Sequence, residues 1–273
     1  MSDYKKVVSP EHTKFLLNVK RKKAAVTATQ IILLILFIIT WEVLASQRLI
    51  DSFITSSPSR ILKTLTNLYK EGTLFHHIAV TCTETIVGFL LGTLIGTTIA
   101  TILWTSNFLS RVFEPYLVIL NSLPKVALGP IFIVWIGAGS ASIIMMALAI
   151  SLIVTIMEVL SGFLGVDKDK IRLVETFGAN RFQTFTKVVL PSTKSTIINA
   201  LKINVGLSWV GVITGEFLVS KAGIGYLIVY GGQVFKLDLV MASVIILGIA
   251  AALMYQGIVY LEKLVFKNHP ENS

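Results

Sequence analysis

The sequence predicts an all-α, polytopic membrane protein with six transmembrane helices, and two observations support this. Of its 273 residues, 54% are hydrophobic and only 14% are charged, whereas a soluble globular chain carries about 25% charged residues. The apolar residues gather in stretches of the roughly 20 residues that a helix needs to cross the hydrocarbon of a membrane. Cys82 is the single cysteine, which excludes a secreted scaffold held together by disulfides within the chain.

A basic tail precedes the first apolar stretch. It spans 1–23, and the rest of the chain, 24–273, is expected to form one transmembrane domain. The tail is rich in Lys and Arg, and the formal net charge of the chain is +9. A basic flank of this kind is typical of the cytoplasmic side of a membrane. Only Tyr4 and Phe15 accompany the tail's charges, so a nucleic-acid surface, which needs aromatic stacking, is not expected.

The six spans are expected at about 24–45, 80–104, 113–136, 142–162, 197–219 and 239–260. The first is expected to be a retained anchor because it is long and follows an extended basic tail, unlike a cleaved signal peptide. The uncharged run from Val126 to Met157 is too long for one span, so Gly137 to Ser140 is expected to form a turn between two helices. Both termini then lie on one side of the membrane, and the excess of Lys and Arg there predicts that both are cytoplasmic.

Two features lie outside this simple pattern of spans. Segment 56–77 has apolar residues at helical spacing and is expected to form an amphipathic helix at the outer surface. Within the second span, Gly88, Gly92 and Gly96 recur at intervals of four, leaving a strip that another helix can approach closely. Packing within the chain is the expected use of this strip, and a contact between subunits is the alternative.

No motif for catalysis or metal binding is found in the sequence. It lacks a phosphate-binding loop, a zinc-protease motif and a nucleophile elbow. The histidines are His12, His76, His77 and His269, and all four fall outside the expected spans. Because adjacent residues cannot share one face of a helix, His76 and His77 are expected to have a surface role. We therefore expect no catalytic residue, metal site or cofactor in this chain, and not an enzyme.

The loop between the fourth and fifth spans, 163–196, is long and regularly patterned. Connections in compact proteins have a median of about 4–6 residues, and much longer ones are usually functional or disordered. Asp167 or Asp169 is expected to cap a first short helix, and small residues at 178–180 separate it from a second. The apolar positions of the two helices are Ile171, Val174 and Phe177, then Phe182, Phe185 and Val189. The helices form a compact knob or, alternatively, rest on the membrane interface.

The knob carries a resemblance to a known family. The segment from Arg172 to Pro191 resembles the EAA loop of ABC importer permeases, whose pattern is EAA, three residues, Gly, nine residues, Ile, any residue and Leu-Pro. The residues at matching offsets are Gly178, Val188, Leu190 and Pro191. The segments 122–137 and 215–228 are similar to the third-span signature and the end of span five in the nitrate/sulfonate/taurine-type permeases. Arg172 stands at the position of the motif's Glu, and Glu175 is expected to meet it on the same helical face.

The resemblance implies a type I ABC importer permease-like fold in the plasma (inner) membrane. Two copies of the permease, most simply a homodimer, would form the pathway among membrane lipids. ATP and Mg would bind to a separate ABC ATPase subunit, and an extracytoplasmic substrate-binding protein would deliver the solute. That solute would be small, of the sulfonate, nitrate, taurine or vitamin-precursor class.

The resemblance also implies that the knob is the coupling helix that docks on the ATPase subunit. The expected coupling residues are Arg172, Glu175, Phe177, Gly178, Ala179, Phe182, Phe185, Val188, Leu190 and Pro191. Phe182 and Phe185 are expected to be exposed, with Arg181 and Lys187 as a charged rim, which is the usual composition of a binding hot spot.

Charged and aromatic residues within the spans are candidates for the substrate pathway. They are Glu84, Lys125, Trp135, Glu158, Lys202, Trp209 and Glu216. A charge at the middle of the bilayer costs at least ~2.5–3.5 kcal/mol, so these charged groups need partners or water. Interhelical ion pairs, residues reaching out from span ends and, for the tryptophans, interface anchors remain open alternatives.

Two other functions are compatible with such spans. One is an ion- or proton-coupled secondary transporter that uses the buried carboxylates directly, although its usual internal repeat is not found between the two halves of the sequence. The other is a scaffold that only anchors a soluble complex, which would not need glycine-rich or charged span interiors.

Overall fold

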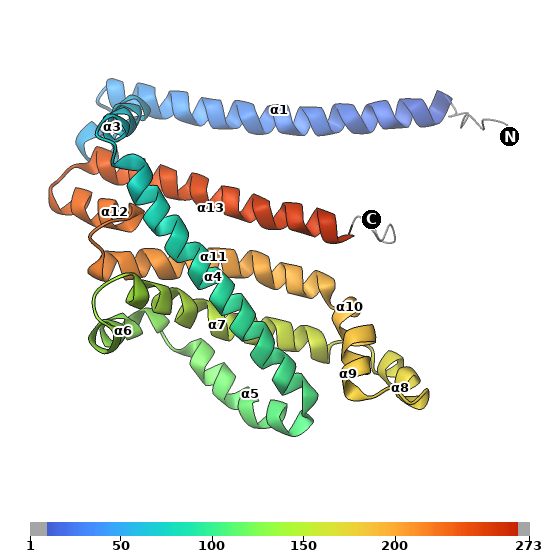
Figure 1. Ribbon diagram of the computed structural model, residues 1–273. Helices are drawn as coiled ribbons and strands as arrows, with labels where there is room; N and C mark the ends of the chain where they lie inside the picture. Colours follow the sequence, from blue (N-terminus) through green and yellow to red (C-terminus); the bar gives the residue numbers. More distant parts are fainter. Residues whose placement is uncertain (1–9, 267–273) are drawn as a thin grey trace. The chain divides into compact units, whose positions relative to one another are not determined.

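The computed structural model describes residues 10–266, and Figure 1 shows their arrangement along the chain. Over this range the chain forms helices joined by turns, without a β-strand, so the all-α prediction is confirmed. Contacts divide the chain into two units, Met1–Lys63 and Thr64–Ser273. The two are described separately below.

The first unit is built on one long helix. Helix α1 (Pro10–Ser46) contains the first expected span, but it begins well before residue 24. The expected tail is therefore helical from Pro10, and its residues 1–9 lie outside the described part of the chain. The short α2 (Ser52–Thr55) follows, and then α3 (Pro58–Lys70) begins. The Glu42 carboxylate accepts hydrogen bonds from the Ser59 backbone N–H at 2.9 Å and from its hydroxyl at 2.8 Å, which stabilises the start of α3.

Helix α3 is the amphipathic helix expected within 56–77. Its side chains Ile61 and Leu68 are buried, and their spacing of seven residues places them on one face. Leu68 belongs to the second unit, where it packs with Leu227 of α12 (Ile224–Gln233) and Leu239 of α13 (Leu237–Phe266). The helical prediction for this segment is confirmed.

Helix α7 (Ser140–Leu164) is the centre of the second unit. It packs against α4 (Leu74–Thr105) along one face and against α11 (Lys194–Val219) along another, as Figure 1 shows. The glycine strip of α4 makes the first contact. A Cβ added to Gly88, Gly92 or Gly96 would lie 2.7, 2.5 or 2.8 Å from the nearest side-chain atom of α7. Those neighbours are Ala147, Ser151 and Thr155, which also recur every four residues.

Small residues also mediate the contact between α7 and α11. A Cβ at Gly211 would meet the Ala147 backbone, and one at Gly215 would lie 3.0 Å from the Ile143 Cα. Both faces of α7 therefore approach a neighbouring backbone more closely than larger side chains permit. The expectation that the glycine strip packs within the chain is confirmed.

The expected span at 113–136 is not one helix. It is divided into α5 (Asn107–Ser122), a 3-10 turn η1 (Lys125–Leu128) and α6 (Gly129–Ile136), with a bend of 86° between the two parts. The break falls at Leu123, whose φ and ψ of −67° and 138° are extended. A residue before proline is disfavoured in the helical region, and Pro124 itself has no N–H to donate. The prediction of a continuous helix here is wrong for this reason.

The expected turn after the third span and the last two expected spans agree with the structure. Gly137 has a φ of +96° and lies in the turn between α6 and α7, where a turn was expected. The fifth and sixth expected spans, 197–219 and 239–260, lie within α11 and α13. Among the described residues, five helices are long and apolar enough to cross a membrane, and the bent pair makes a sixth if it counts as one span.

The segment between α7 and α11 forms the knob. It contains α8 (Lys168–Thr176), α9 (Arg181–Thr184), a π-helical turn η2 (Phe185–Val189) and α10 (Leu190–Ser192). The knob lies at the end of the bundle where α7 ends and α11 begins (Figure 1).

Candidate functional site

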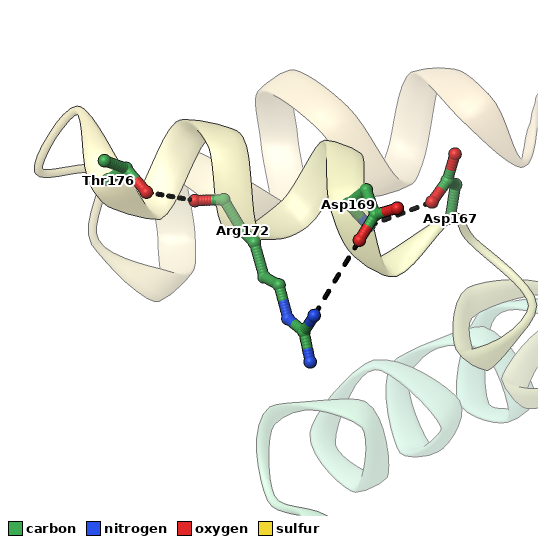
Figure 2. A network of polar contacts seen from close by, with 4 residues as sticks. All are labelled: Asp167, Asp169, Arg172 and Thr176. Carbon is green, nitrogen blue, oxygen red and sulfur yellow. Dashed lines mark hydrogen bonds and ion pairs between the residues drawn. The ribbon is translucent and has the colours of Figure 1, made fainter.

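The first helix of the knob is fixed by local polar contacts. The Asp167 carboxylate accepts a hydrogen bond from the Asp169 N–H at 2.9 Å and so caps α8. Figure 2 shows the Arg172 guanidinium facing Asp169, with 3.8 Å between Nη1 and Oδ1. The Thr176 hydroxyl donates to the Arg172 carbonyl at 2.9 Å. Arg172 therefore pairs with Asp169, and Glu175, three residues after Arg172 on the same helix, lines a crevice together with it. The ion pair is largely exposed and contributes little to stability.

The elbow between the two knob helices follows from three consecutive small or polar residues. Gly178 has a φ of +84°, and its N–H donates to the Glu175 carbonyl at 2.9 Å, which ends α8. Asn180 then starts α9 with a reciprocal cap, because it accepts from the Gln183 N–H at 2.9 Å and its own N–H donates to the Gln183 side chain at 2.9 Å. The prediction of two short helices separated by a small-residue elbow is confirmed.

The second half of the knob is anchored in the bundle. The Phe185 ring contacts Phe163 of α7 edge-on, with 5.2 Å between centroids, and also lies 5.2 Å from Trp104 of α4. Val189 is fully buried in the same cluster, and Val188 packs against it. Phe185 is therefore not exposed as expected. Together with Val189, it holds the knob against the ends of α4 and α7.

An exposed apolar surface remains on the other side of the knob. Phe177 is 83% exposed and Phe182 is 75% exposed, and the elbow at Gly178 lies between them in the sequence. Arg172, Glu175, Leu190 and Pro191 are also exposed, while Ala179 and Val188 are partly covered. Aromatic side chains left exposed beside charged ones are typical of a surface that binds another protein.

At the other end of the bundle, Glu216 lies at the centre of a buried network. Its side chain is 1% exposed. Oε1 accepts from the Thr81 hydroxyl at 2.6 Å, and Oε2 accepts from the Gly225 N–H at 2.5 Å. The Thr81 oxygen in turn accepts from the Ile224 N–H at 2.7 Å. These bonds join α4, α11 and the start of α12.

The glycines after Glu216 make room for its carboxylate. Gly223 has a φ of +113°, and a Cβ there would collide with the Glu216 carboxylate. A Cβ at Gly225 would lie 2.7 Å from Oε2. The spacing of Glu216, Gly223 and Gly225 in the sequence is therefore a packing requirement of this network.

His77 belongs to the same network. The Gly223 N–H donates to its Nδ1 at 3.0 Å, and its ring stacks on Tyr226 with 5.9 Å between centroids. The expectation of a surface role is therefore wrong for this histidine. The sequence analysis did not connect His77 with Glu216, and it did not single out Thr81. The available signal was their spacing of four residues on the helix that also carries Glu84.

Glu84 lies next to this network. Its side chain is 3% exposed, and its carboxyl group lies beside Ser140 and Glu216. Within the described part of the chain, neither of its carboxyl oxygens has a hydrogen-bond partner. Two of the expected pathway residues are thus buried neighbours with no cation between them in the described residues, an arrangement that a low-dielectric interior disfavours when both are charged.

The other expected pathway residues are dispersed. Lys202 forms an interhelical ion pair with Glu262 at 2.8 Å, which was one of the alternatives left open. Lys125 donates to the Asn121 carbonyl at 2.9 Å, close to the bend after α5. Glu158 and Trp135 are exposed. Trp209 is buried and, with Lys202, lines a cavity of about 720 Å³ between α11 and α13.

Comparison with known proteins places this architecture among solved transporters. The chain matches a subunit of the MetNI methionine ABC transporter, captured in inward-facing conformations, with a TM-score of 0.55 and 19% identity, covering 69% of this chain and 97% of that one. It also matches an amino acid ABC transporter with a TM-score of 0.56 and 15% identity, covering 75% of this chain and 97% of the other. These similarities show the fold of a type I ABC importer permease, as expected.

Curated relatives extend the similarity to the level of sequence. A putative aliphatic sulfonates transport permease protein, SsuC of Bacillus subtilis, is 25% identical over 83% of this chain and 82% of its own length. The taurine transport system permease protein TauC of Escherichia coli is 24% identical, covering 85% and 86%. The formylaminopyrimidine transport permease protein ThiX of Halalkalibacterium halodurans is 26% identical, covering 90% and 97%.

The family assignment rests on most of the transmembrane domain. Residues 88–265 match the family described as binding-protein-dependent transport system inner membrane component. This range includes the knob, the bent pair and, from the buried network, Glu216, Gly223 and Gly225. The chain belongs to this family of multi-pass inner-membrane permeases of ABC importers.

Proposed function

We propose that this chain forms the solute pathway of an ATP-driven importer and couples it to a separate ATPase subunit through the knob. ATP and Mg would be held by that subunit, two permease copies would enclose the pathway, and an extracytoplasmic binding protein would deliver the solute. Both termini and the knob would then face the cytoplasm, as the basic residues of the sequence favour.

One observation carries the proposal: the exposed Phe177 and Phe182 on a knob that is otherwise anchored. Phe185 and Val189 attach the knob to the ends of α4 and α7, so the free aromatic surface is held in a fixed place. A surface that is apolar, exposed and rigidly held has little conformational entropy to lose on docking. The same segment carries the residues that match the EAA pattern, which supports an ATPase as the partner.

Loss of this surface is expected to release the ATPase subunit. In the double variant Phe177→Ser/Phe182→Ser, two aromatic anchors are removed, and interface anchors of this kind contribute about 2 kcal/mol or more each. We therefore expect a reduction in ATPase recovery of at least tenfold when the tagged permease is co-expressed with its partners and purified in detergent. Mass spectrometry identifies the co-purifying subunits, and ATP hydrolysis by the eluate is the second readout.

Phe235→Ser is the matched control. Phe235 is also an exposed phenylalanine, but it lies between α12 and α13, away from the knob in sequence and structure. It should leave the recovery of the ATPase unchanged. Undiminished recovery with the double variant, or an equal loss with Phe235→Ser, would contradict the docking surface.

The elbow gives a second, independent prediction. Gly178→Leu is expected to insert normally but to lose ATP-dependent uptake, because a leucine at a φ of +84° costs about 1–2 kcal/mol in backbone strain and distorts the elbow. Gly178→Asn is the control, since asparagine tolerates this conformation better. Uptake of solute into membrane vesicles loaded with ATP is the measurement. Normal uptake by the leucine variant would show that the geometry of the elbow is not needed.

The proposed solute is small and belongs to the sulfonate, nitrate, taurine or vitamin-precursor class. This is supported by relatives that are named for aliphatic sulfonates, taurine, riboflavin and formylaminopyrimidine transport. The cavity that Trp209 and Lys202 line is mostly apolar, which suits an organic solute more than a bare inorganic anion.

A secondary transporter driven by an ion gradient is the competing function, and the neighbouring Glu84 and Glu216 are the observation that favours it. Uptake into proteoliposomes separates the two. The importer requires internal ATP, the ATPase subunit and the binding protein, and is insensitive to collapse of ion gradients. Uptake by the chain alone that follows an imposed gradient would overturn the importer proposal.

A further inference from the structure

A polar crevice lies where the knob meets the ends of the spans. It has a volume of about 280 Å³ and lies between the ends of α4 and α7, the start of α5 and the helices α8 and α9. Trp104 and Phe163 contribute apolar wall, while Asn107 contributes a polar side chain at the start of α5. Trp104 and Phe163 also contact Phe185, so the crevice borders the cluster that anchors the knob, and the exposed Phe177 and Phe182 do not line it.

The crevice is lined by an excess of positive charge. Lys168, Arg172 and Arg181 line it, against a single acidic side chain, Glu175. Figure 2 shows the Arg172 guanidinium extending away from α8, and Arg172 lines the crevice together with Trp104 and Asn107. Its contact with Asp169 is long and exposed, so Arg172 remains available to a further anion.

Two of the donors are already oriented. Arg181 donates from Nη1 to the Thr105 carbonyl at the end of α4, which holds its guanidinium at the mouth of the crevice. Thr184 is 2% exposed and lines the crevice, and its hydroxyl has no hydrogen-bond partner in the described residues. A buried hydroxyl without a partner is costly, and an anion in the crevice would accept its hydrogen bond.

The crevice lies where two long apolar helices end, as expected for a site at a membrane interface. The apolar helices α4 and α7 end there, at Thr105 and Leu164, and Trp104 is an aromatic residue of the kind enriched at the level of lipid headgroups. Basic pockets between the ends of membrane helices bind the phosphate groups of anionic lipids. Guanidinium groups are also well matched to phosphate oxygens, to which they donate in pairs.

We propose that this crevice binds a phosphate group, carried by an anionic lipid headgroup or by a soluble phosphate compound. Lys168, Arg172 and Arg181 supply the charge, and Thr184 supplies the buried donor. Because its walls come from α4, α5, α7, α8 and α9, a bound phosphate would stabilise the knob in its present position on the bundle.

Native mass spectrometry of the full-length chain in neutral detergent tests the proposal. The chain is titrated with phosphatidylglycerol, with phosphatidylcholine and, in a second arm, with inorganic phosphate against chloride at equal ionic strength. For a lipid ligand, we expect phosphatidylglycerol to be retained at least tenfold better than phosphatidylcholine. Each of Lys168→Gln and Arg181→Gln should weaken retention about fivefold, and Thr184→Val should weaken it about tenfold without changing charge.

Lys170→Gln is the matched control, since Lys170 lies on α8 like Lys168 but does not line the crevice. This variant should retain phosphatidylglycerol as well as the unaltered chain does. Retention of phosphatidylglycerol that depends on Thr184 identifies a lipid headgroup as the ligand. Binding of inorganic phosphate that depends on Thr184, without a preference between the lipids, identifies a soluble phosphate compound. Equal retention of both lipids with no phosphate binding overturns the proposal, as does a loss in Lys170→Gln as large as that in Thr184→Val.

Discussion

Gly211→Leu is expected to leave almost no correctly folded chain in the membrane. A Cβ at this position of α11 would meet the Cα of Ala147 and lie 2.9 Å from its backbone nitrogen. Backbone atoms in the middle of a packed helix cannot move aside as the end of a flexible side chain can, so α7 and α11 must separate. Overpacking in a core costs about 1–3 kcal/mol even where side chains adjust, and a separated α7 would also lose its contacts with α4.

The yield of monodisperse protein after extraction in mild detergent, and its resistance to limited proteolysis, are the measurements. Gly206→Leu provides a matched control on the same helix, because no heavy atom lies within 4 Å of a Cβ built there. It should be obtained in normal amounts. If the two variants were recovered equally well, the close approach of α7 and α11 would not be a requirement of the fold.

Glu216→Ala is expected to lower the free energy of unfolding by about 2–6 kcal/mol, because two buried donors lose their acceptor at about 1–3 kcal/mol each. The donors are the Thr81 hydroxyl and the Gly225 N–H. Their loss frees the start of α12 from α4 and α11. Thermal unfolding of the detergent-solubilised permease, followed by light scattering or by the reactivity of Cys82 toward a thiol reagent, measures the effect.

Glu84→Gln supplies the contrast. Its carboxyl oxygens have no hydrogen-bond partner in the described residues, and it lies beside a second carboxyl group. Replacing it with a neutral isostere keeps the shape of the side chain and leaves Glu216 as the only carboxyl group of the pair, so the thermal midpoint should stay the same or rise. A fall as large as that of Glu216→Ala would show that Glu84 has a stabilising partner, such as a bound cation.

The positions of the spans could be predicted because a membrane helix needs a long apolar stretch and little else. The break in the third span could not be predicted so simply. Pro115 lies inside α5 without ending it, whereas the helix stops before Pro124. A proline in a membrane helix is tolerated where neighbouring groups satisfy the freed backbone. Which of the two prolines is tolerated depends on neighbours that only the folded chain defines.

In the knob, too, the sequence does not predict which single side chains are buried. Phe182 and Phe185 lie on one apolar stripe in the sequence, yet Phe182 is exposed and Phe185 contacts Trp104 and Phe163. Helical spacing assigns both to one face, and it does not say where along that face the bundle ends. Similarly, Glu216 could be singled out as a charge within a span, but Thr81, its partner, is 135 residues away in the sequence.

The contacts of α7 divide the second unit mechanically. Aromatic contacts of Phe185 join the knob to α4 and α7 at one end, and closely approaching glycines join α4, α7 and α11 along their length. The bent segment is different, since a Cβ at Gly137 or at Gly139 would meet nothing within 4 Å. The turn after α6 therefore has room for larger side chains, whereas the start of α6 is closely packed, since a Cβ at Gly129 would lie 2.5 Å from a side-chain atom of Leu218.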